Sequence, residues 1–175
     1  AQITPEFSLR GNYSYLDAQL TADVPNLLQI RNSQVASVRP KFVRVGVFDG
    51  DRLPGSAKHS GSFAADYVVP VGDNGEVKFN WTATYTGNIL SRVGNRGFGE
   101  TLPDYLTHRA AITYQVADSY EISLFANNIT NEYAVTGISN DRSRFGFVNG
   151  GIISRYYGRS VLTPRVIGIE ARYNF

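Results

Sequence analysis

Six long segments of the chain alternate between apolar and polar side chains, and this period of two constrains the fold more than any other feature. The last segment ends on Phe175 and has apolar residues at every second position before it, namely Ile167, Ile169, Ala171 and Tyr173. The other segments are residues 7–15, 61–69, 77–86, 109–116 and 120–127. Successive side chains of a strand point to opposite faces, so six strands with one apolar and one polar face are expected. No segment has a convincing helical period, and the chain is predicted to be all-β.

The connections between these segments alternate between short and long. Residues 72–75 (GDNG) and 117–119 (ADS) have the composition of tight turns, whereas residues 21–59, 87–105 and 134–160 form long connections. Short turns at one end and long loops at the other are typical of transmembrane antiparallel β-barrels, in which the short turns face the periplasm. The pattern therefore favours a barrel that crosses the membrane several times.

Two of the long connections contain signals of further hairpins. Apolar and polar residues alternate on both sides of Pro40, and Asn149-Gly150 is a strong signal for a type I′ turn. Either hairpin could extend the neighbouring strands beyond the membrane or supply further strands to a barrel wall. Six strands alone are too few to close around packed side chains.

The two predicted faces differ in kind. The apolar face carries Tyr, Phe and Trp near the strand ends with Ala and Gly between them, which resembles the aromatic girdles at the two membrane interfaces. The core of a soluble sandwich, the second interpretation, would instead be filled by branched aliphatic residues. The opposite face carries polar residues of mixed charge: Arg10, Asn12, Asp66, Lys78, Thr82, Arg109, Gln115, Glu121, Glu170 and Arg172.

The composition argues against several function classes. Lys and Arg total 17 against 15 Asp and Glu, and this balance does not indicate a nucleic-acid partner. There is no cysteine, and His59 and His108 lack metal-ligand spacing, so we predict no metal and no cofactor. The Asp49-Gly50-Asp51 stretch is expected to be a turn, and the chain is not expected to be an enzyme. Methionine is absent even at position 1, which suggests a processed protein or a piece of a longer one.

Four motifs in order resemble the C-terminal barrel portion of TonB-dependent outer-membrane receptors. They are SLRGNYSYLDAQL at 8–20, GDRLPGSAKHSGSFAADYVV at 50–69, YEISLFANNITNEYAVTG at 120–137 and YYGRSVLTPRVIGIEARYNF at 156–175. The resemblance covers nearly the whole chain, although SVLT interrupts the family's usual Gly-Arg-Pro-Arg element between Arg159 and Pro164.

The resemblance implies that residues 1–175 are the last six or so strands of a roughly 22-stranded barrel whose plug domain is absent from this chain. The implied function is import of a scarce nutrient, such as a ferric siderophore, cobalamin or a carbohydrate, across the outer membrane. The implied partners are outer-membrane lipid and lipopolysaccharide, the barrel-assembly machinery, a small-molecule ligand, and the energy-transducing TonB protein, which would engage the absent plug segment. The alternative is a self-contained small outer-membrane barrel with a structural or adhesive role.

The resemblance also suggests two groups of functional residues. Ligand contacts are expected from basic and aromatic residues of the long connections: Arg44, Arg142, Arg144, Arg155, Tyr156, Tyr157 and Arg159. Arginine and aromatic side chains suit anionic ferric chelates, but they could instead contact lipopolysaccharide phosphates or only solubilise the loops. The implied signal for barrel assembly consists of Ile167, Ile169, Tyr173 and Phe175. These four residues could also be lipid-facing wall residues and nothing more.

Overall fold

The computed structural model describes residues 1–32, 41–97, 99–116, 119–148 and 151–173. Within these ranges, the side chains of residues 29–32, 41–43, 139–148 and 151–157 are not described. The described part of the chain is almost entirely β-structure, and its one short 3-10 turn spans Val93–Asn95. No helix within these ranges has the length and apolarity needed to cross a membrane.

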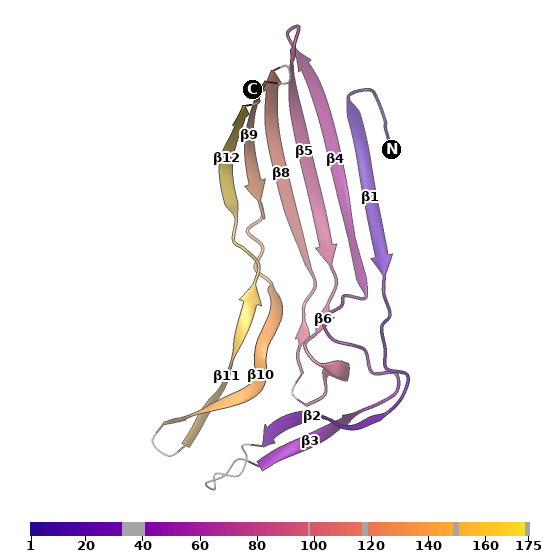
Figure 1. Cartoon of the computed structure of the whole chain (residues 1–175), viewed down its shortest axis with the longest axis vertical. Coiled ribbons are helices and arrows are strands. Elements are labelled where there is room, and N and C mark those ends of the chain that lie inside the picture. The colour runs from indigo at the N-terminus through magenta and orange to yellow at the C-terminus, as the bar shows by residue number, and fades with distance from the viewer. Residues whose placement is uncertain (33–40, 98, 117–118, 149–150, 174–175) are drawn as a thin grey trace.

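In the described part of the chain, six strands form one antiparallel sheet in the order β1-β4-β5-β8-β9-β12 (Figure 1). The strands of this wall sheet are β1 (Phe7–Tyr15), β4 (His59–Val71), β5 (Gly75–Thr86), β8 (Tyr105–Val116), β9 (Tyr120–Asn127) and β12 (Val166–Tyr173). They coincide with the six alternating segments, so the predicted all-β fold and strand positions are confirmed.

The short and long connections lie at opposite ends of the wall sheet, as predicted (Figure 1). At the turn end, the β4–β5 connection begins at Gly72, whose φ of +64° is a left-handed conformation that glycine adopts without strain. The other end, called the loop end, carries three long loops, defined as residues 16–58, 87–104 and 128–165. The six wall strands therefore have short connections at the turn end and all three long loops at the loop end.

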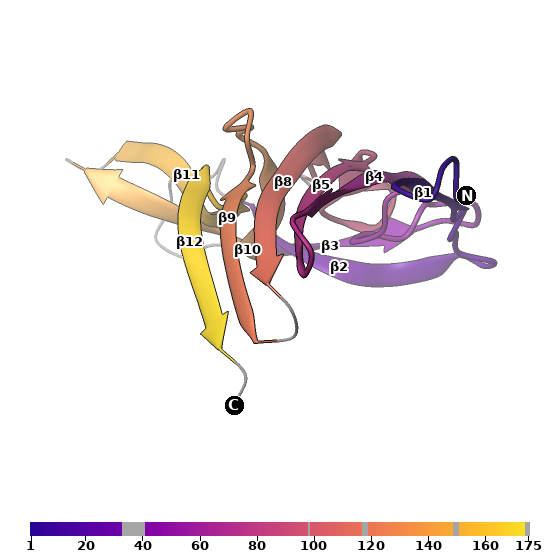
Figure 2. The ribbon, with the colours of Figure 1, turned by 90° about the horizontal axis from the view of Figure 1, so that it is seen from above.

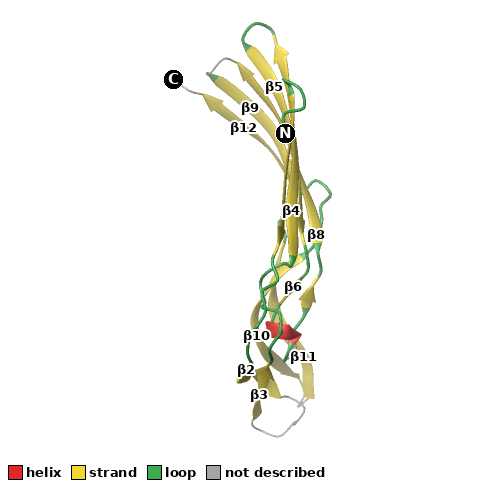
Figure 3. Ribbon diagram, turned by 90° about the vertical axis from the view of Figure 1, so that its right-hand side faces the viewer, coloured by secondary structure: helices red, strands yellow, loops and turns green. Residues whose placement is uncertain are grey.

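Each long loop contains a separate two-stranded antiparallel sheet (Figure 3). The pairs are β2 (Val24–Asn32) with β3 (Lys41–Val47), β6 (Ile89–Leu90) with β7 (Thr101–Leu102), and β10 (Val135–Val148) with β11 (Gly151–Val161). In the third loop, Val148 pairs with Gly151, and the predicted type I′ turn at Asn149-Gly150 lies outside the described residues. In the first loop, the alternation on both sides of Pro40 indicated a hairpin. β3, which follows Pro40, pairs with β2, which ends at Asn32. These hairpins do not join the wall sheet.

The wall strands are staggered. Phe7 of β1 aligns, through β4, with Phe79 of β5, whereas Tyr173 of β12 aligns, through β9 and β8, with Gly75 of β5. The sheet therefore shifts by four residues toward the turn end between β1 and β12. A sheet closed into a barrel needs such a stagger, because its strands tilt against the barrel axis.

The wall sheet is a single layer from β12 to β1 (Figure 2). Among the described residues, the buried hydrophobic side chains are Val47, Leu102 and Ala134, and all three lie in the long loops. The apolar face of the wall stays open, with Ile169 75% and Ile167 65% exposed. The second sheet that a soluble sandwich would need does not occur in the described part of the chain.

Candidate functional site

The apolar face of the wall sheet forms a band with aromatic rims. Its central row contains Phe7, Tyr67, Phe79, Ile112, Leu124 and Ile169, which are aligned across all six strands. The rings of Tyr120 and Tyr173 are in tilted contact, 4.9 Å between centroids, near the turn end, and Tyr13 and Tyr15 lie near the loop end. Aromatic rims around an apolar band are the pattern expected of a surface that meets lipid.

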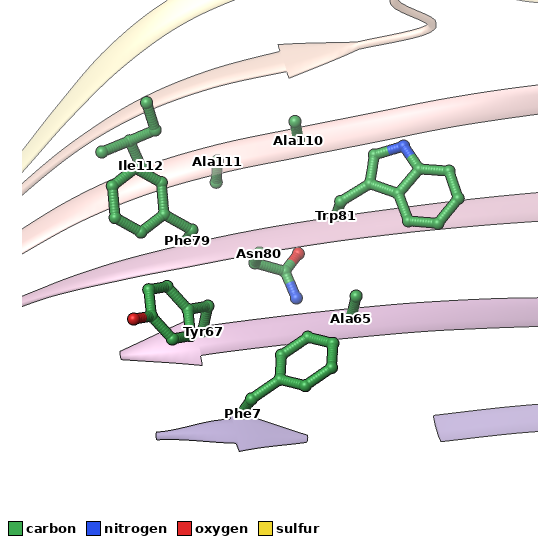
Figure 4. Close-up of a pocket in the computed structure, with 9 residues that line it drawn as sticks. All are labelled: Phe7, Ala65, Tyr67, Phe79, Asn80, Trp81, Ala110, Ala111 and Ile112. Carbon is green, nitrogen blue, oxygen red and sulfur yellow. The ribbon is translucent and has the colours of Figure 1, made fainter. Parts of the chain in front are cut away.

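Small residues create shallow hollows on this face. Figure 4 shows Ala65 and Ala110 between larger side chains such as Tyr67 and Trp81, where they leave a hollow of about 320 Å³. A second hollow of about 250 Å³ lies on the other side of β8 and is lined by Ala126 among others. Both hollows are apolar and fit hydrocarbon, but they lack the convergent polar side chains that orient a specific ligand.

The polar face carries hydrogen bonds and ion pairs within and between its strands. The carboxylate of Asp66 accepts from Arg10 at 2.7 Å and from the amide of Asn80 at 2.5 Å. Lys78 forms an ion pair with Glu76 at 2.8 Å and donates to the amide oxygen of Gln115 at 2.9 Å. This face therefore pairs most of its own charges, as expected of a wet surface rather than an apolar core.

Near the loop end, the polar face is hollowed into a recess of about 450 Å³. The recess is lined by Asn80, Thr82, Thr84, Thr107, His108, Arg109, Asn127, Asn128, Leu162, Thr163 and Pro164. Arg109 supplies the one guanidinium of this lining, which contains no carboxylate. The lining thus combines hydroxyl and amide groups with a positive charge.

Asn128 fixes the edge of this recess to the base of the third loop. Its side-chain amide donates to the carbonyl oxygens of Glu132 and Thr163, each at 2.9 Å, and its oxygen accepts from the backbone of Glu132 at 2.8 Å. Asn128 is only 8% exposed and has a φ of +50°, a conformation that asparagine tolerates better than most residues. The start and the end of the third loop are therefore joined through one side chain.

A charged junction joins the first and second long loops. The carboxylate of Asp51 accepts from the Arg96 guanidinium and, at 2.8 Å, from the backbone of Phe48, whose ring lies 4.3 Å below that guanidinium. These hydrogen bonds hold the pKa of Asp51 below its usual value, with the Arg96 bond as the largest cause. Gly94 has a φ of +54°, and a Cβ there would come within 2.5 Å of this carboxylate, so a larger residue would displace the Asp51 side chain.

Two further contacts extend the junction across the loop end. Arg52 donates to the side-chain and backbone oxygens of Asn88 at 2.7 and 2.6 Å, again between the first and second loops. Arg159 of β11 forms an ion pair with Glu100 at 3.0 Å and so joins the third loop to the second. The three loops are thus linked to one another in a single group.

The structure places some of the sequence-predicted ligand residues at the loop end. Arg44 is exposed on β3, and Arg159 pairs with Glu100. Arg144 lies opposite Tyr156 in the β10–β11 register. Five of the predicted ligand residues have side chains that the structure does not describe, namely Arg142, Arg144, Arg155, Tyr156 and Tyr157. A ligand role for all seven residues stays a prediction.

The described residues of the predicted assembly signal lie on the apolar face. Ile167, Ile169 and Tyr173 are at least half exposed there, and Phe175 lies outside the described residues. Their recognition by the assembly machinery stays a prediction. The Asp49–Asp51 stretch is a turn, as predicted, with Gly50 at a φ of +79°. No group of three His, Asp or Glu within the described ranges could hold a metal ion.

Sequence reasoning did not identify the recess at Arg109, the role of Asn128 or the Asp51–Arg96 junction. Arg109 stood on the predicted polar face, but the identity of its neighbours depends on strand register. The Asn128 signal was present in the NNITNEY motif, where an Asn-rich stretch directly after a strand indicates side-chain bonds to the backbone. Asp51 and Arg96 are 45 residues apart, and no local pattern connects them.

The chain is similar to one family model and to several solved structures, one of which is a siderophore receptor. The family model for "TonB dependent receptor-like, beta-barrel" matches residues 2–129. The crystal structure of the siderophore receptor PiuA from Acinetobacter baumannii superposes with a TM-score of 0.63 over 97% of this chain, at 19% sequence identity. This chain spans 19% of the length of that receptor. No curated protein matches the sequence.

Proposed function

We propose, because the chain belongs to the family of TonB-dependent receptor-like β-barrels, that it is the C-terminal part of the wall of an outer-membrane nutrient importer. The imported nutrient would be a ferric siderophore, cobalamin or a carbohydrate. The wall strands would enclose a wet passage, and the linked loops at the loop end would meet the ligand outside the cell. The proposed role is transport, without bond chemistry.

The observation that carries this proposal is the staggered, two-faced wall sheet with open edges at β1 and β12. An open sheet edge leaves backbone groups without hydrogen-bond partners, which is very costly in hydrocarbon. The first residues of the chain contact only a short part of the β1 edge, through Gln2 opposite Ser8, and no described strand pairs with the rest of that edge or with β12 on its outer side. The edges therefore favour a wall that continues into a larger barrel.

The energy for import would come from the TonB protein, which we expect to engage a plug segment outside this chain. Outer-membrane lipid and lipopolysaccharide would cover the apolar band, and the barrel-assembly machinery would recognise the last strand through Ile167, Ile169, Tyr173 and Phe175. Candidate ligand contacts are the basic and aromatic residues predicted in the long loops. Their cationic and aromatic groups suit an anionic chelate.

The test of this proposal is the intact mass of the native protein that carries this C-terminus, extracted from outer membranes. A barrel of about 22 strands with a plug implies roughly 70–100 kDa, at about ten or more residues per strand plus loops. A mass near 19.3 kDa would contradict the proposal and favour the self-contained small barrel. Energy coupling is tested separately, by uptake of a labelled nutrient into cells. Uptake that stops when the inner membrane is depolarised would support a TonB-driven importer.

A further inference from the structure

We propose that Arg109 and the hydroxyl and amide groups around it form a binding site for an anionic, oxygen-rich group of the imported ligand. The inference rests on the proposed import function and adds a site on the wall strands that would select an anionic ligand. The site is the recess on the polar face near the loop end. A ligand that enters from the loops would reach this part of the wall first.

The strand register brings the polar groups of the recess together. Arg109 of β8 lies between Thr82 of β5 and Asn127 of β9, which are its direct partners in the two neighbouring strands. Thr84 and Thr107 form the next aligned pair on this face toward the loop end. Directly aligned residues of antiparallel strands point to the same face, so these hydroxyl and amide groups lie on the same face as the exposed Arg109 side chain.

The charge at Arg109 lacks the counter-charge that the other cations of this face have. Arg10 pairs with Asp66, Lys78 with Glu76, and Arg172 with Glu170 at 3.3 Å. Within the described ranges, the exposed Arg109 side chain has no hydrogen bond or ion pair, and the recess lining contains no Asp or Glu. A guanidinium presents a planar fork that binds carboxylate, phosphate or catecholate oxygens through two parallel hydrogen bonds. The recess therefore favours an anion.

The recess is also of suitable size and is held by rigid elements. Its volume of about 450 Å³ admits one arm or ring system of a small ligand. Three wall strands form its floor, and Asn128 fixes its edge through bonds to Glu132 and Thr163. A site on strands holds its donors more precisely than a site on loops, so little ordering is required when a ligand binds.

The experiment compares an anionic and a neutral iron chelate on the full-length receptor purified in detergent. The probes are ferric tris-catecholate, with three negative charges, and neutral ferric tris-acetohydroxamate, and their affinities are measured by quenching of intrinsic fluorescence. We expect Arg109→Gln to weaken the anionic probe about tenfold or more, because a charge-assisted bidentate contact is lost, and to change the neutral probe by less than about twofold. Arg109→Lys should retain part of the affinity, because it keeps the charge without the fork.

The matched control is Arg172→Gln, which changes the same residue type on the same face at the turn end, where Arg172 already pairs with Glu170. It should leave both affinities unchanged. An equal loss for both probes in Arg109→Gln would overturn the inference, because it would indicate a structural role or pairing with a carboxylate of a domain inside the barrel. An unchanged affinity for the anionic probe would overturn it as well.

A second measurement separates failure of this inference from failure of the proposed cargo. If the parent receptor binds neither chelate, these two complexes are excluded as cargo, and citrate then serves as the anionic probe. Citrate should slow the reaction of Arg109 with phenylglyoxal, measured by peptide mass spectrometry, while the reaction of Arg172 is unaffected. Equal reaction rates of Arg109 with and without citrate would overturn the anion site.

Discussion

At the scale of single residues, Asn128 has the largest expected effect on the third loop. Replacement by alanine removes three hydrogen bonds to Glu132 and Thr163. It also leaves alanine at a φ of +50°, which alanine tolerates less well than asparagine. We expect the free energy of opening the loop base to fall by roughly 2–4 kcal/mol. Hydrogen exchange of the Leu162 amide, which donates to Ala134, measures this opening.

Asn128→Gly is the control for the backbone contribution. Glycine adopts positive φ freely but also lacks the three hydrogen bonds, so its effect should be smaller than that of alanine and still clearly destabilising. If both variants exchange like the parent protein, the side chain of Asn128 does not hold the loop base.

The ion pair of Asp51 predicts acid sensitivity of the junction between the first and second loops. The pKa of Asp51 is lowered by the Arg96 hydrogen bond and then by the Phe48 backbone N–H. A lowered pKa means that the pairing contributes fully above the ordinary pKa of 3.8 and is lost as the pH falls through the lowered value. We expect protection of the Gly94 amide, which donates to Arg52, to decrease below about pH 4.

Asp51→Asn tests whether this titration is the cause. The variant should protect the Gly94 amide less at neutral pH and should lose the acid dependence, after correction for the intrinsic exchange rate. Protection in the parent protein that is constant down to about pH 3 would contradict a role for the ionised carboxylate.

At the scale of strands, the two faces predict opposite responses to the same substitution. Leu124 lies on the apolar band between Ile112 and Ile169, whereas the preceding Ser123 lies on the polar face between Thr113 and Glu170. In a membrane, Leu124→Arg should lower the free energy of unfolding by about 2–4 kcal/mol, while Ser123→Arg places its charge near Glu170 and should cost little. Urea titrations of the full-length receptor in lipid vesicles measure both, and equal effects would contradict the assignment of the faces.

The strands were predictable from the sequence because strand periodicity is a local property. Residues 7–15 and 120–127, for example, alternate cleanly and form β1 and β9 as expected. The partner of β3 was not predictable, because residues on both sides of Pro40 alternate and pairing is decided by contacts beyond that stretch. The lack of a partner for Arg109 follows from the alignment of three strands, and the Asp51–Arg96 contact follows from the packing of two loops, so neither has a local signal.

At the scale of the whole molecule, the stagger and the open edges belong together. A shift of four residues between β1 and β12 gives the wall strands a tilt, and a tilted wall closes only when enough strands complete the circumference. The long-loop hairpins form separate sheets at the loop end and do not add to this circumference. The open apolar band and the unpaired edges are consequently stable only beside further strands and lipid.

This reasoning predicts how residues 1–175 behave when they are produced alone and refolded in detergent. Because β1 and β12 each leave an unpaired edge, we expect oligomers or aggregates rather than monomers in size-exclusion chromatography with light scattering. The full-length receptor in the same detergent should elute as one defined species, because its edges are paired. A stable monomer of the isolated chain that resists protease would mean that the hairpins rearrange to close a small barrel, and would favour the self-contained barrel over the importer.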